Sequence, residues 1–69
     1  MELLKHEVTN PVIENTYTFQ HPTEGVLVYK EWIDGGKCID CVLRSKGGYD
    51  IDDPALLEEV QNFVDQLEV

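Results

Sequence analysis

The chain has few cysteines, few basic residues and no long apolar run. Its two cysteines, Cys38 and Cys41, are expected to be free thiols in a reducing compartment. The longest apolar run, at residues 25–29, is far too short to cross a bilayer. The first eight residues contain Glu2, Lys5 and Glu7 where a secretion signal needs an apolar stretch. We therefore expect a cytoplasmic protein without membrane contact.

Basic residues are scarce in relation to acidic ones. Fourteen acids against five bases give a formal net charge of −9. From Lys46 to Val69 the sequence has seven acids, and Lys46 is the only base. Such a field repels nucleic acid and anionic lipid and favours basic partners, so we expect no direct nucleic-acid binding. The acidity is also explained by solubility alone.

Repeats and polar low-complexity tracts are absent, and 42% of the 69 residues are hydrophobic. This composition predicts one folded domain over residues 1–69. Turn-forming groups at 10–11, 21–25, 34–37 and 45–48 separate runs in which apolar and polar residues alternate. We therefore predict three antiparallel strands over 12–20, 26–33 and 38–45, with residues 3–8 as a candidate fourth strand.

The last segment changes to a helical period. Apolar residues recur there on one side of a helix, while the remaining positions are mostly acidic or amide residues. Asp53 can accept hydrogen bonds from first-turn amides, and Pro54 suits the first helical position. The pattern predicts a helix from Pro54 to Leu67. Negative charge at its C-terminal end, from Asp65 and Glu68, opposes the helix dipole.

Alternation assigns the strand residues to two faces. A hairpin through Gly35 and Gly36 pairs Ile33 with Cys38, and continuing this register pairs Tyr29 with Val42. The face expected to pack on the helix carries Val28, Trp32, Ile39, Cys41 and Leu43, with Tyr17 and Phe19 as candidates, and Trp32 is expected to contact Phe63. The outer face is expected to carry Leu27, Tyr29, Glu31, Ile33, Cys38, Asp40, Val42 and Arg44.

One helix can cover only one face of a small sheet. The predicted fold class is therefore α+β: a small two-layer domain in which a three-stranded antiparallel meander, four-stranded with residues 3–8, carries one C-terminal helix on one face. The outer face would remain partly apolar.

The Cys-x-x-Cys spacing of Cys38 and Cys41 raises the question of redox or metal chemistry. Redox pairs of this kind sit at a helix N-terminus, whereas this pair falls inside a predicted strand. A regular strand would set the thiols on opposite faces, about 10 Å apart at their Cα atoms, unless a bulge at Asp40 intervened. A zinc site would need His6 and His21, which precede the cysteines at a spacing that no zinc finger uses.

Other chemical motifs fail on spacing. A calcium loop starting at Asp50 meets Pro54 and Ala55 at positions that need an oxygen ligand and glycine. The glycines beside Lys37 and Lys46 do not form a phosphate-binding loop. We therefore expect no catalytic residue, no metal site and no cofactor.

The sequence is best interpreted as a small acidic, non-enzymatic protein–protein interaction module. Its partner is expected to be another protein or a second copy of the chain, as a homodimer through the outer sheet face. One alternative is a thiol-dependent or metal-binding protein centred on Cys38 and Cys41. The other is an acidic inhibitor that mimics nucleic acid. The predicted interaction residues are Leu27, Tyr29, Ile33, Val42, Asp65 and Glu68.

Overall fold

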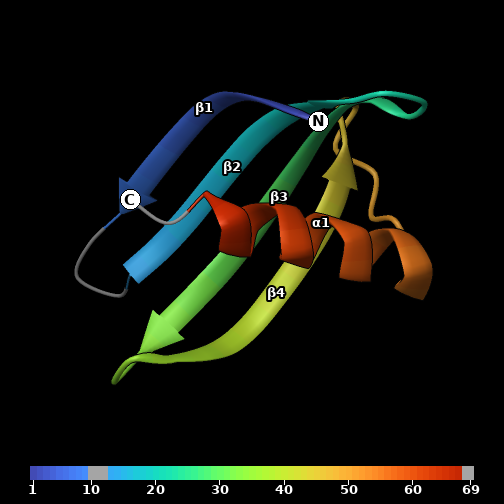
Figure 1. The fold of residues 1–69 in the computed structure, drawn as a ribbon. Helices are drawn as coiled ribbons and strands as arrows, with labels where there is room; N and C mark the ends of the chain where they lie inside the picture. Colours follow the sequence, from blue (N-terminus) through green and yellow to red (C-terminus); the bar gives the residue numbers. More distant parts are fainter. Residues whose placement is uncertain (10–12, 68–69) are drawn as a thin grey trace.

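The computed structural model describes residues 1–9 and 13–67. In this part of the chain four strands precede one helix: β1 (Glu2–Thr9), β2 (Ile13–His21), β3 (Gly25–Asp34), β4 (Lys37–Ser45) and α1 (Pro54–Gln66). The strands form one antiparallel sheet in the order β1-β2-β3-β4, and α1 crosses one of its faces (Figure 1). The predicted α+β fold is confirmed, and the candidate strand over residues 3–8 forms part of β1.

Local chemistry explains where the elements turn and begin. Gly35 and Gly36 close the β3–β4 hairpin with φ angles of 60° and 82°. Two positive φ angles are what a two-residue type I′ turn requires, and glycine adopts them without steric strain. The Asp53 side chain accepts hydrogen bonds from the amides of Ala55 at 3.1 Å and Leu56 at 3.2 Å, and Pro54 follows as predicted. The start of α1 is therefore set by capping.

The core lies between α1 and the sheet face beneath it. Phe19, Leu27, Tyr29 and Leu43 of the sheet are buried against Val60 and Val64 of the helix. The rings of Phe19 and Phe63 meet with centroids 5.5 Å apart. Burial of each large apolar side chain contributes about 1.5–3 kcal/mol, so this cluster holds the two layers together.

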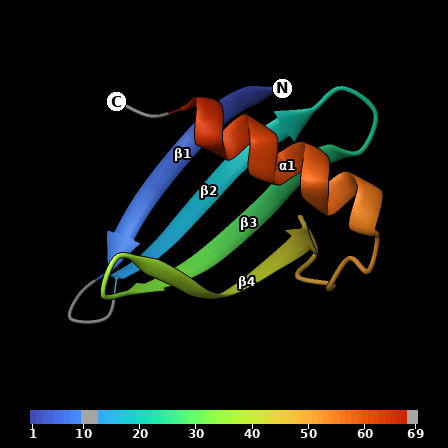
Figure 2. The same ribbon diagram turned by 60° about the horizontal axis from the view of Figure 1, so that its bottom comes forward.

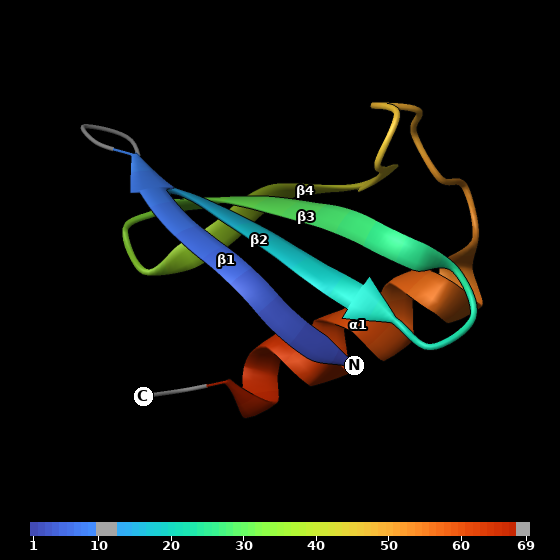
Figure 3. The same cartoon turned by 90° about the horizontal axis from the view of Figure 1, so that it is seen from above.

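The helix covers only part of its face of the sheet. In Figure 2 it runs obliquely from the C-terminal end of β4 toward the N-terminal end of β1. The half of the sheet nearer the β3–β4 hairpin is left without a helix above it. The other face of the sheet carries no element of the described chain, as the view in Figure 3 shows.

The predicted assignment of faces is wrong for β3, and a bulge in β4 is the reason. Near the hairpin, Ile33 pairs with Cys38 as predicted, but Trp32 pairs with Asp40, so Ile39 is an extra residue in β4. An extra residue in one strand reverses, for all pairs beyond it, which residues of the neighbouring strand share a face with a given residue. Tyr29 consequently pairs with Leu43, not with Val42.

Leu27 and Tyr29 therefore lie under the helix instead of on the outer face. Their exposed fractions are 1% and 2%, which makes them core residues. Trp32, three residues further along β3 than Tyr29, has the opposite parity and points away from α1. The predicted contact of Trp32 with Phe63 is therefore also wrong, because Phe63 packs on Phe19.

Candidate interaction surfaces

The uncovered sheet face can be laid out as a grid, because the strand register fixes which residues lie side by side. Side chains two apart in a strand share a face, and those opposite the core positions point away from α1. We call this set the bare face. Its rows, read from β1 to β4, are Thr9, Glu14, Trp32 and Asp40; then Glu7, Thr16, Lys30 and Val42; then Lys5, Thr18, Val28 and Arg44; then Glu2, Gln20 and Val26 on the first three strands.

Apolar side chains gather on the β3 and β4 part of the bare face. Val26, Val28 and Trp32 lie along β3, and Val42 lies on β4 beside Lys30. All four are half-buried by their neighbours in the sheet alone. A half-buried tryptophan on an otherwise open sheet face is a favourable contact for a partner, because binding would remove the rest of its ring from water.

The charges of the bare face nearly cancel. It carries the bases Lys5, Lys30 and Arg44 and the acids Glu2, Glu7, Glu14 and Asp40, and Asp50 lies beside Arg44 at its edge, so the net charge is −2. The remainder of the chain therefore carries −7 of the total of −9.

The three bases are held in ion pairs. Lys5 Nζ lies 3.3 Å from Glu7, Lys30 Nζ lies 3.2 Å from Glu14, and Arg44 Nε lies 3.0 Å from Asp50. The pair of Lys30 with Glu14 is the most sheltered of these, with less than a third of each side chain exposed. Each base of the bare face is thus compensated by a nearby acid.

A second candidate lies on the helix side, where a cleft of about 190 Å³ opens between α1 and the sheet. Its lining includes Tyr29, Glu31, Cys38, Gln61, Val64 and Asp65. Glu31 accepts hydrogen bonds from Asn15 Nδ2 at 3.3 Å and from the Tyr17 hydroxyl at 3.4 Å. The hydroxyl pKa of Tyr17 is raised by burial first and then by the charge of Glu31. Asp65 of the predicted acidic surface lines this cleft, and Glu68 lies outside the described residues.

The two cysteines share the helix side of the sheet, so the prediction that they lie on opposite faces is wrong. The bulge at Ile39 turns Cys38 into the cleft, and Cys41 packs beside the core with the Gln61 amide 3.7 Å from its sulfur. Both are free thiols. Desolvation is the largest cause that raises the pKa of Cys38, and the charges of Glu31 and Asp40 add to it. A raised pKa keeps the thiol protonated and slow to react at neutral pH.

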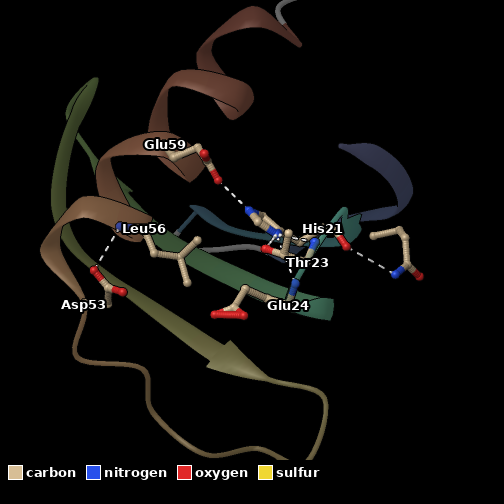
Figure 4. A network of polar contacts seen from close by, with 7 residues as sticks. His21, Thr23, Glu24, Asp53, Leu56 and Glu59 are labelled. Atoms are coloured by element: carbon tan, nitrogen blue, oxygen red, sulfur yellow. Dashed lines mark hydrogen bonds and ion pairs between the residues drawn. The ribbon is translucent and has the colours of Figure 1, made fainter.

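His21 is the residue whose role the sequence did not reveal. It ends β2 at the expected turn, but its ring is only 6% exposed. Nδ1 accepts hydrogen bonds from the backbone amides of Thr23 and Glu24, each at 3.1 Å. The ring proton therefore sits on Nε2, which bonds to the Glu59 carboxylate of α1 (Figure 4). His21 ties the β2–β3 turn to the helix.

The Thr23 hydroxyl, His21 and Glu59 are connected in the order of a hydrolase triad. Thr23 Oγ1 lies 3.2 Å from His21 Nδ1. A general base needs a free lone pair on that nitrogen, and here the lone pair already accepts two backbone amides. The arrangement is explained as a turn-stabilising contact.

Within residues 1–9 and 13–67, no group of three or more histidine, cysteine, aspartate or glutamate side chains could hold a metal ion. In the same ranges no helix has the length and hydropathy needed to cross a membrane. Comparison of the chain with protein-family models, with curated proteins and with solved structures finds no match. The surfaces themselves are therefore the basis for inferring function.

Proposed function

We propose that the chain is a small non-enzymatic protein–protein interaction module that docks through the bare face, with a second copy of the chain as the occupant argued for below. The observation that carries this proposal is the open sheet face with Trp32 half-buried at its surface. Sheets in small folds usually bury apolar faces, and an uncovered one with an aromatic anchor is suited to a partner.

The composition of the bare face suits docking to protein. Val28 and Thr18 lie side by side on the middle strands, flanked by Lys5 and Arg44 on the outer ones. Lys30, next to Val28 on β3, is paired with Glu14, so the middle of the face combines an apolar side chain with polar ones and a compensated charge, as protein–protein interfaces commonly do. Of the predicted interaction residues, Val42 belongs to this surface, whereas Leu27, Tyr29 and Ile33 lie on the helix side of the sheet.

One observation favours the thiol-dependent alternative, because Cys38 and Cys41 lie on the same side of the sheet. A second observation opposes it, because the pKa of Cys38 is raised, whereas a reactive thiol requires a lowered pKa. Nucleic-acid mimicry is also less well supported, because three of the five bases of the chain lie on its one flat face and offset the acids there. The interaction module remains the function that the geometry supports best.

Site-specific photocrosslinking tests the proposal. A photoreactive benzoylphenylalanine replaces Val42 on the bare face or, as the matched control, Glu58 on the exposed side of α1. We expect a discrete adduct from position 42 in the cells that produce the chain, with the chain itself or with another protein, and its loss when Thr18→Lys is added. Adducts at position 58 alone, or the same adducts from both positions, would overturn it.

A further inference from the structure

We propose that a second copy of this chain covers the bare face, so that two sheets pack face to face in a two-fold dimer. The inference rests on the proposed function and names the partner for the same surface. It is carried by the distribution of charge, by the order of residues on the grid and by the area of the sheet.

The distribution of charge favours this face over any other for contact between copies. Each copy carries −9, of which the bare face holds −2, and its three bases are all paired with acids. Contact through the helix side would instead bring together two helices that have acids but no Lys or Arg. Like charges brought together cost free energy, so the nearly neutral face is where two copies can approach.

The order of residues on the grid gives two favourable pairs of contacts across a two-fold axis. Consider a two-fold axis that lies in the interface, runs across the strands and passes between the row of Lys30 and the row of Val28. This axis places Glu7 of one copy opposite Lys5 of the other, because both residues lie on β1 in these adjacent rows. It also places Trp32 opposite Val26, which gives the aromatic ring an apolar partner. The same axis places Lys30 opposite Val28 and Arg44 opposite Val42, so the methylene stems of the two basic side chains lie over the valines. Every contact of an isologous interface occurs twice in this way.

The area of the face is sufficient for a reversible dimer. The strands have eight to ten residues, so the sheet is about 27–33 Å long and about 19 Å wide from the standard rise and strand spacing. Such a face buries about 500 Å² per copy and about 1,000 Å² in total, the lower limit for a specific interface. We therefore expect a dimer that dissociates on dilution.

Sedimentation velocity of the purified chain between about 5 µM and about 1 mM tests the inference over the range where a weak interface associates. We expect monomer at the low end and dimer at the high end. Val28→Lys and the milder Thr18→Lys each add a positive charge at the centre of the bare face and should weaken association at least about tenfold. Val8→Lys is the matched control, since Val8 is an exposed valine whose partner, Asn15, lies on the helix side of the sheet.

Three results would overturn the second-copy proposal: a monomeric chain at every concentration, an effect of Val8→Lys as large as that of Val28→Lys, or no effect of Thr18→Lys. Because Thr18 is a polar residue of the exposed sheet surface, its variant stays informative if Val28→Lys does not fold. A monomeric chain that still crosslinks another protein from position 42 would overturn the dimer alone. A monomeric chain without such crosslinks would overturn the proposed function as well.

Discussion

At the scale of single residues, side-chain hydrogen bonds of Asp53 and His21 fix where the helix begins and how the β2–β3 turn is attached to it. Asp53 and Pro54 were predicted to start the helix, because a capping side chain acts within three residues of itself. The role of His21 was not predictable, since its partner Glu59 is 38 residues away in the sequence. A histidine before a proline has no local pattern that distinguishes a buried ring from an exposed one.

The contacts of His21 predict its contribution to stability. His21→Ala removes the acceptor of two backbone amides and the donor to Glu59, so it should lower the free energy of unfolding by about 1–3 kcal/mol. Glu59→Gln keeps an acceptor oxygen and should cost less, and Glu58→Gln serves as an exposed control on the same helix. Urea denaturation measures all three. A loss for His21→Ala no greater than that for Glu58→Gln would show that the network is not stabilising.

The thiol of Cys38 gives a prediction that depends on pH. In a Cys41→Ser background, the rate of iodoacetamide alkylation should rise with pH and reach half its maximum above the ordinary pKa of a cysteine thiol, because only the thiolate reacts. Glu31→Gln removes a charge that raises this pKa, so it should move the midpoint to lower pH. Mass spectrometry of the labelled chain gives the rates. A midpoint below the ordinary value would favour the thiol-dependent alternative.

The secondary-structure elements were largely predictable, and their relative faces were not. Alternation and turn chemistry located the strands, the Gly35–Gly36 hairpin and the helix. The faces depended on one extra residue, Ile39, whose side chain is 60% exposed in the structure. In the sequence, Ile39 cannot be distinguished from any other β-branched strand residue. That one residue moved Leu27 and Tyr29 into the core and Trp32 out of it. Periodicity alone does not reveal a bulge.

Deletion of Ile39 tests this account of the register. Removing the extra residue leaves Cys38 directly before Asp40, so the pairs Ile33–Cys38 and Trp32–Asp40 become neighbours in a regular ladder. The core positions of β4 keep their face, and we expect a folded chain that loses about 1 kcal/mol or less. Deletion of Val42 is the control and should cost more stability, because it moves Cys41 away from the core and places Asp40 beside Glu31 on the helix side. Circular dichroism with thermal unfolding distinguishes the two. An unfolded Ile39 deletion alongside a folded Val42 deletion would contradict the register.

At the scale of the whole molecule, the excess of negative charge and the uncovered apolar surface are separated. Most of the net negative charge lies outside the bare face, which combines paired charges with Val28, Val42 and Trp32. The sequence predicted that a partly apolar sheet face would remain uncovered. It placed Val42 there correctly and omitted Trp32, because the bulge could not be foreseen.

The same separation predicts how salt affects association. Two copies that each carry −9 repel each other at long range, and salt screens this repulsion, whereas the apolar contacts of the bare face do not depend on screening. Sedimentation in about 0.02 M and about 0.5 M NaCl should therefore show tighter association at the higher concentration. Weaker association at high salt would mean that ion pairs such as Glu7 with Lys5 of the second copy dominate the contact.

The most direct test of the central claim is acrylamide quenching of Trp32. Because Trp32 is the chain's only tryptophan and lies on the bare face, its fluorescence reports whether that face is covered. We predict that, between about 5 µM and about 1 mM chain, the quenching constant falls and the emission moves to shorter wavelength as association excludes water from the ring. The Val28→Lys variant should keep the quenching constant and emission wavelength of the dilute chain at every concentration. A quenching constant in the wild-type chain that does not change with concentration would contradict the claim that a second copy covers this face.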